Sequence, residues 1–187
     1  MSKVLKRLSG AVVCFERVFP KREDKPMKKY MATFLCCALN LTAECSFPSN
    51  TLIATTDEVR DIKTGLIWRR CALGQTWQNN RGCVGEVELM RRAEVEEKAR
   101  LLGEKWRLPT LDELLTLVDD RCQPPVINTK IFGKVRDTTG EGANYLTASI
   151  YLEGDAAIPT LFYTIDLLNG GVDAHTKGFA GAVRLVR

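Results

Sequence analysis

Seven cysteines are the residues of this 187-residue sequence best suited to covalent or metal chemistry. Three precede residue 44, and the last four are Cys45, Cys71, Cys83 and Cys122. If the chain is exported, as its N-terminal pattern indicates, the even number left favours two disulfides, for which three pairings exist. The turn-forming composition of residues 72–82 favours a local Cys71–Cys83 bridge, which leaves Cys45 to pair with Cys122.

Zinc binding and nucleophilic catalysis are the alternative uses of these cysteines. Structural zinc sites need closely spaced Cys or His pairs, whereas the last four cysteines are 26, 12 and 39 residues apart. A catalytic nucleophile needs a neighbouring base, and the single histidine, His175, lies in a segment that predicts a solvated loop. Asp166, Asn169 and Asp173 are too sparse for a calcium site. We therefore expect no metal, no cofactor, no catalytic residue and no enzyme activity.

Cationic and aromatic side chains around the Cys71–Cys83 loop are the candidates for ligand binding. Guanidinium groups bind oxyanions in a fork geometry, and clustered cations attract anionic partners. Trp68 ends a predicted strand and Trp106 precedes a predicted helix, so we expect both to be buried structural residues. The predicted patch for an anionic glycan consists of Trp77, Arg69, Arg70 and Arg81.

Residues 27–43 have the pattern of a secretory signal peptide. Two lysines follow Met27, an uncharged, mostly apolar run comes next, and a polar stretch begins at Glu44. We expect cleavage after Ala43, which places the mature protein in the periplasm, at the cell surface or outside the cell. We interpret residues 1–26 as an overhang upstream of a true start at Met27; a long n-region is the alternative.

Removal of residues 1–43 would change the net charge, and with it the class of partner that the charge favours. The whole chain has 27 basic and 23 acidic residues, a formal net charge of +4. Residues 1–43 hold nine of the basic and three of the acidic residues, so the mature chain has 18 and 20 and a charge of −2. A nucleic-acid partner thereby loses its support. No apolar run reaches the length of a spanning helix, so we expect no membrane span.

Two helices are predicted in the first half of the mature chain. Residues 86–102 are rich in strong helix formers and precede Gly103, which suits a helix C-terminus. A capping box of Thr110 and Glu113 begins a second, shorter helix. The apolar residues expected to face the core are Leu89, Ala93, Val95, Ala99 and Leu102 in the first helix and Leu111, Leu114, Leu115 and Val118 in the second.

Strands are predicted on both sides of these helices. Residues 57–70 predict two strands joined by a tight turn. The second half is rich in β-forming residues and has a hairpin signal at 169–171. The strands expected there are 145–152, 161–168 and 182–186. Helices in the first half and strands in the second indicate a single α+β domain over residues 44–187.

Several sequence blocks occur in a specific order. They are residues 61–68, residues 71–77 closed by Cys83, the Trp-Arg-Leu-Pro-Thr block 106–114, Cys122 with residues 125–128 and 131–132, and the terminal residues 183–187. With these blocks the chain resembles the bacterial domain family named for the C-terminal domain of the collagen-like adhesin Lcl. One departure is at residues 145–149, where the family has an aromatic-Ser-Ser block.

The resemblance implies a C-type-lectin-like fold, akin to that of formylglycine-generating enzymes, with two helices packed on a twisted antiparallel sheet and long loops. It also implies an exported or surface protein, and some members bind glycosaminoglycans or other host ligands. We therefore expect a disulfide-stabilised, non-enzymatic binding domain, an adhesin or ligand-binding surface protein whose partner is a glycan or another surface protein. The alternative is a structural or assembly accessory of a pilus or secretion system without a small ligand of its own.

Overall fold

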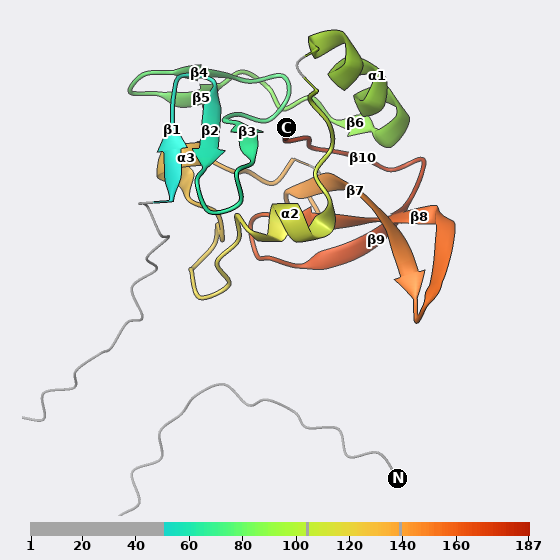
Figure 1. The fold of residues 1–187 in the computed structure, drawn as a ribbon. Coiled ribbons are helices and arrows are strands. Elements are labelled where there is room, and N and C mark those ends of the chain that lie inside the picture. The colour runs from blue at the N-terminus through green and yellow to red at the C-terminus, as the bar shows by residue number, and fades with distance from the viewer. Residues whose placement is uncertain (1–50, 104, 139) are drawn as a thin grey trace, which may run out of the picture. The chain divides into compact units, whose positions relative to one another are not determined.

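The computed structural model describes residues 51–103, 105–138 and 140–187. The predicted signal peptide, the segment 1–26 and Cys45 lie outside the described residues. Within the described ranges the chain has the predicted α+β composition, with antiparallel sheets and few helices (Figure 1). None of these helices is long and apolar enough to cross a membrane.

The first sheet consists, in spatial order, of β1 (Leu52–Ala54), β2 (Glu58–Asp61) and β3 (Ile67–Arg69). The antiparallel β2–β3 hairpin confirms the strand pair predicted for residues 57–70 and sets Val59 opposite Trp68. Its turn is held by the carboxylate of Asp61, which accepts two hydrogen bonds from the turn residues that follow it. Val59 and Trp68 are both 0% exposed, so the hairpin forms one wall of the core.

The second sheet consists, in spatial order, of β7 (Asn144–Glu153), β8 (Ala156–Asp166) and β9 (Val172–Thr176). β7 and β8 confirm the two strands predicted here, and the chain reverses after β8 around the predicted turn. The sequence does not predict β9, because an exposed edge strand with small and polar residues has little apolar pattern. β9 contains His175, so the expected solvated loop is wrong. The His175 ring stacks on Phe179, with centroids 3.7 Å apart.

The C-terminal residues 182–187 run through the interior of the protein. The regular strand predicted at 182–186 is wrong, because consecutive residues pair with different segments instead of one neighbouring strand. The backbone partners are Asn144 and Leu146 for Ala182, Leu73 for Val183, Arg69 for Leu185, Arg107 for Val186 and Ile67 for Arg187. The short antiparallel pair of β6 (Met90–Arg91) and β10 (Ala180–Gly181) leads into this segment.

Two hydrophobic clusters make up the core, and the C-terminal segment contributes to both. Val186 belongs to the cluster around Trp68, whereas Val183 and Leu185 belong to the cluster around Trp106. An extended chain points successive side chains to opposite sides. The alternation in the C-terminal sequence therefore serves two cores at once.

Helix α1 (Arg92–Leu102) begins later than the predicted residue 86 and ends at Gly103 as predicted. The residues before it instead form a backbone contact with the first half of the chain and strand β6. Only Val95 and Ala99 of the expected apolar stripe are therefore buried. The exposed members of that stripe are Leu89, Ala93 and Leu102.

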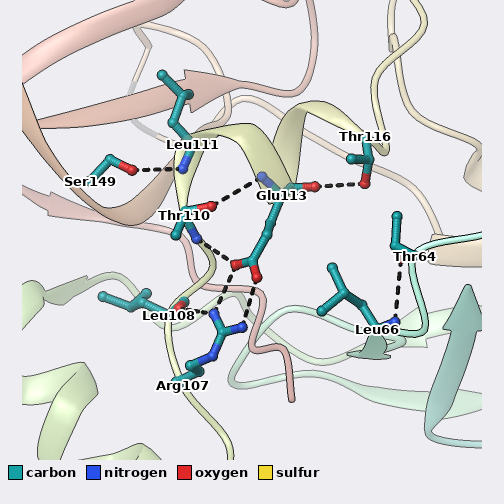
Figure 2. A network of polar contacts seen from close by, with 9 residues as sticks. All are labelled: Thr64, Leu66, Arg107, Leu108, Thr110, Leu111, Glu113, Thr116 and Ser149. Atoms are coloured by element: carbon teal, nitrogen blue, oxygen red, sulfur yellow. Dashed lines mark hydrogen bonds and ion pairs between the residues drawn. The ribbon is translucent and has the colours of Figure 1, made fainter.

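Helix α2 (Leu111–Leu115) begins at the predicted capping box (Figure 2). The Glu113 amide donates to the Thr110 hydroxyl at 3.2 Å, and the Glu113 carboxylate accepts a hydrogen bond from the Thr110 amide at 2.8 Å. The same carboxylate accepts two hydrogen bonds from the guanidinium of Arg107, at 2.7 and 2.8 Å. Because the Arg107 backbone pairs with Val186, the capping box is tied to the C-terminal segment.

The chain after α2 differs from the prediction. Leu114 is buried as expected, but Leu115 is 37% exposed, because the helix ends there and Leu117 enters the core instead. The structure also contains a short helix that the sequence analysis does not predict, α3 (Thr129–Phe132). Its N-terminus is capped by Asn128, whose side-chain oxygen accepts hydrogen bonds from two backbone amides.

Replacing Glu113 by Gln should destabilise the protein in a pH-dependent way. Hydrogen bonds from Arg107 hold the pKa of the Glu113 carboxyl below its ordinary value, against the opposing effect of burial. A depressed folded-state pKa stabilises the protein above the unfolded-state pKa, and this contribution is lost as the pH falls through the folded-state value. We expect a loss of about 1 kcal/mol at neutral pH, shrinking toward zero below about pH 4.

Urea denaturation of Glu113→Gln and the parent protein across this pH range measures the effect. The matched control is Glu97→Gln, which removes an ion pair with Arg100 on the exposed face of α1. Exposed pairs contribute little, so the control should change the free energy of unfolding by much less. A loss that does not vary with pH, or one that is equal in the control, would contradict the assignment.

Candidate functional site

The predicted Cys71–Cys83 disulfide is present, with Cα atoms 5.5 Å apart. It fastens the antiparallel hairpin of β4 (Thr76–Gln78) and β5 (Gly82–Val84) to the end of the first sheet. Cys122 is disulfide-bonded as well, and Cys45, the partner predicted for it, lies outside the described residues. Each cysteine in the described part of the chain therefore serves a bridge.

The four residues of the predicted glycan-binding patch do not form one site: Arg69 and Trp77 line one hollow, and Arg81 lines another. Arg70 lies over Trp77, with its Cζ 3.2 Å from the ring centroid, and its guanidinium also donates to two backbone carbonyls. Arg69 instead faces Trp106, 5.6 Å from that ring. Neighbouring residues of an extended chain point to opposite sides, which explains why the two arginines separate. Arg81 is exposed beside the hairpin turn.

The three tryptophans differ in exposure as the sequence predicts. Trp68 is 0% and Trp106 is 6% exposed, so both are structural core residues. Trp77 is only partly buried. Its ring is nevertheless covered by the Arg70 guanidinium at a distance that indicates a cation–π contact. Trp77 is therefore the most accessible of the three rings, although part of its surface is already occupied.

Two hollows flank the β4–β5 hairpin. The smaller, about 100 Å³, is lined by Arg69 and Trp77 among others. The larger, about 620 Å³, contains Arg81. Small-molecule sites commonly have volumes of about 300–1,000 Å³, so the larger hollow is the candidate site. We call it the basic groove, and its cationic lining residues are Arg81, Lys134 and Arg136.

The basic groove has a charged mouth and a buried inner end. Arg81, Lys134 and Arg136 are exposed, and the carboxylates of Glu86 and Asp137 lie among them. Neither Lys134 nor Arg136 has an ion-pair partner within the described ranges. The buried residues that line the inner end are Ala143, Tyr145 and Ala182. A ligand would therefore meet cations at the mouth of the groove and the edges of three buried residues at its inner end.

Gly133 brings the two walls of the basic groove together. Its φ is +76°, and a Cβ at this position would lie 2.7 Å from the Sγ of Cys83. Only glycine avoids both the strain and the clash. The Cys83 sulfur also lies 3.4 Å from the carbonyl oxygen of Phe132. The disulfide and the end of α3 are thus in contact, and the chain carries Lys134 and Arg136 directly past Arg81.

Most of this site is not predicted from the sequence. Lys134, Arg136 and Tyr145 are not among the predicted binding residues, and only Arg81 is. The available signal was the pair of cations at alternate positions after Gly133. These two cations indicate a binding site only when the disulfide and α3 are known to be in contact, and no local sequence pattern predicts that contact.

A comparison with family models places these features in a known family. The model of the Lcl C-terminal domain matches residues 57–187, which contain the disulfide loop, the basic groove and the C-terminal segment. The chain belongs to the Lcl C-terminal domain family. Searches of curated proteins and of solved structures found no match. In the described part of this Lcl C-terminal domain, no three His, Cys, Asp or Glu side chains group as a metal site.

Removing the local disulfide should destabilise the Lcl C-terminal domain. The bridge closes a loop with a sequence separation of 12, for which chain entropy predicts about 3 kcal/mol. We expect Cys71→Ser/Cys83→Ser to lower the free energy of unfolding in urea by about this amount. Its groove-lining residues 83–87 should exchange amide hydrogens faster. Residues 144–166 of β7 and β8 provide the internal reference. Unchanged stability and exchange would show that the bridge does not hold the hairpin.

Proposed function

We propose that this Lcl C-terminal domain is an exported, disulfide-stabilised binding domain with no catalytic chemistry of its own, and that the basic groove holds an acidic glycan. The observation that carries the proposal is the set of three cations, Arg81, Lys134 and Arg136, around a hollow of about 620 Å³. We propose further that the fold is C-type-lectin-like and that the protein acts in the periplasm, at the cell surface or outside the cell.

The charges of the basic groove favour an acidic glycan over other anions. The predicted mature chain has a net charge of −2, so the three groove cations are a local feature and not part of a basic surface. Glu86 and Asp137 lie in the same groove, and carboxylates accept hydrogen bonds from hydroxyl groups. An acidic sugar offers both hydroxyl donors and oxyanion acceptors. A DNA strand offers phosphate oxyanions but no hydroxyl donors along its length for the two carboxylates.

The groove cations have no strong partners within the described residues, which also supports ligand binding. The Arg81 guanidinium has the Gln78 side-chain oxygen as a partner, 3.2 Å away, and both residues are exposed. Such a neutral, exposed contact is weak and can be exchanged for a carboxylate or sulfate, which binds a guanidinium more strongly. Arg70, in contrast, is committed to Trp77 and to backbone carbonyls. The proposed binding residues are therefore the groove cations and not the Trp77 cluster.

The variant Arg81→Ala/Lys134→Ala/Arg136→Ala should bind an acidic glycan more weakly. The probe is a heparin-derived hexasaccharide, measured by isothermal titration calorimetry at low salt. Loss of three exposed charge contacts should weaken binding by roughly 10- to 30-fold. The matched control is Arg60→Ala/Lys63→Ala/Lys177→Ala, which removes three exposed cations that do not line the groove.

The control should keep most of the affinity. Equal losses in both triple variants would show non-specific charge attraction and contradict a site in the groove. Failure of the parent protein to bind any acidic glycan, on an array as well as in solution, would contradict the proposed function. That result would favour the role of an assembly accessory without a small ligand.

A further inference from the structure

Arg184 is a buried cation behind the basic groove. It is 1% exposed, and its guanidinium donates hydrogen bonds to the carbonyls of Arg69 at 2.9 Å, of Arg70, and of Phe132 at 3.5 Å. Burial lowers the pKa of Arg184, and its interactions with Tyr145 partly oppose that effect. No carboxylate in the described ranges forms an ion pair with it. Its neighbours therefore supply dipoles but no negative charge.

Two residues that line the basic groove pack against this cation. The Arg184 Cζ lies 5.7 Å from the centroid of the Tyr145 ring. The Cys83 sulfur lies 3.4 Å from the Phe132 carbonyl and 3.9 Å from the Arg70 carbonyl, which are two of the acceptors of Arg184. Tyr145 and Cys83 both line the groove. Arg184 is thus about one side chain behind the groove surface.

A buried charge without a counter-ion acts electrostatically on groups several ångströms away. A buried cation is costly unless it is paired with an anion, and the three carbonyl dipoles offset the cost only in part. The field of the cation is weakly screened by the surrounding protein. Because Tyr145 and Cys83 lie beside Arg184 or its acceptors and line the groove, a negative group there would be attracted by Arg184 as well as by the exposed cations.

Tyr145 is the polar group between the cation and the groove. It is 4% exposed and lines the groove. Among the described residues no acceptor takes a hydrogen bond from its hydroxyl. A hydroxyl that lies near a guanidinium directs its lone pairs toward that cation and its proton away from it. The arrangement leaves the Tyr145 proton available to a ligand.

We propose that Arg184 and Tyr145 together make the inner end of the basic groove an oxyanion subsite, in which the Tyr145 hydroxyl donates to one carboxylate or sulfate group of the ligand. This inference rests on the proposed function and adds to it a specific role for two buried residues. Tyr145 is the residue that touches the ligand. Arg184 is a positioning residue, which acts through Tyr145 and through its field.

The variant Tyr145→Phe tests the subsite, because it keeps the ring against Arg184 and removes only the hydroxyl. We expect the affinity for the heparin-derived hexasaccharide to fall about tenfold. The melting temperature should fall slightly as well, because the hydroxyl also interacts with the buried Arg184. The matched control is Tyr163→Phe, whose hydroxyl accepts from the Leu152 amide outside the groove. It should bind the hexasaccharide as the parent protein does.

Three outcomes separate the two proposals. If Tyr145→Phe and the groove triple variant both bind the hexasaccharide more weakly than the parent protein, the groove and the subsite are both supported. A weakened triple variant with Tyr145→Phe at parent affinity overturns the subsite and leaves the groove in place. If neither variant changes the affinity, the groove itself is overturned.

Modified probes identify the oxyanion and need no variant. The parent protein is titrated with carboxyl-reduced hexasaccharide and with hexasaccharide that lacks only its 2-O-sulfates, so that both derivatives lose about the same charge. If one group occupies a buried subsite, one derivative should lose at least about tenfold more affinity than the other. Equal losses would indicate diffuse charge attraction and would overturn the subsite, whatever the folding behaviour of Tyr145→Phe.

Discussion

The passage of residues 182–187 through the interior is the constraint on which the other parts of this Lcl C-terminal domain depend. Within six residues the chain exchanges backbone hydrogen bonds with the first sheet, the segment before β6, the segment before α2 and β7. Its side chains alternate between two hydrophobic clusters. Elements that have few contacts with each other are thereby fixed through one common partner, and the functional surface is positioned by the same segment.

Arg184 extends this role from the backbone to the side chains. Its guanidinium donates to carbonyls at the end of β3, directly before Cys71, and to that of Phe132 at the end of α3. The segments that follow these two points, residues 83–87 and 134–138, contribute to the lining of the basic groove. A hydrophobic residue could fill the space, but it could not satisfy several carbonyls. The arginine fork does so and at the same time places a positive charge behind the groove. The packing of the fold and the proposed preference for an anionic ligand thus both depend on this arginine.

Features that depend on neighbouring residues were predictable from the sequence. The β2–β3 hairpin, the Thr110–Glu113 capping box and the Cys71–Cys83 bridge are each specified within a short stretch of chain. Features that depend on distant partners were not. The final segment has a strand-like alternation, yet its alternation reflects two cores and several partners. The groove likewise needs α3 to touch the disulfide, which local periodicity does not encode.

The separation of the predicted arginines has the same explanation. Arg69 and Arg70 are adjacent in the sequence and were expected to act together with Arg81. Their side chains leave an extended chain on opposite sides, and each finds an aromatic ring of the protein itself. Cations already in contact with aromatic rings are less available to a ligand. Counting cations along the sequence therefore overestimates how many are available to a ligand. Two of the three groove cations, Lys134 and Arg136, come from a different part of the chain.

The most direct test of the proposed binding groove is an NMR titration of the protein with the heparin-derived hexasaccharide, following backbone amide chemical shifts. We expect the largest changes in the residues that line the basic groove, which include 83–87, 134, 136–138, 143 and 145. Changes centred on Trp77 and Arg69, in the smaller hollow, would place the site on the other side of the hairpin. Changes scattered over the surface, or none, would contradict a binding groove.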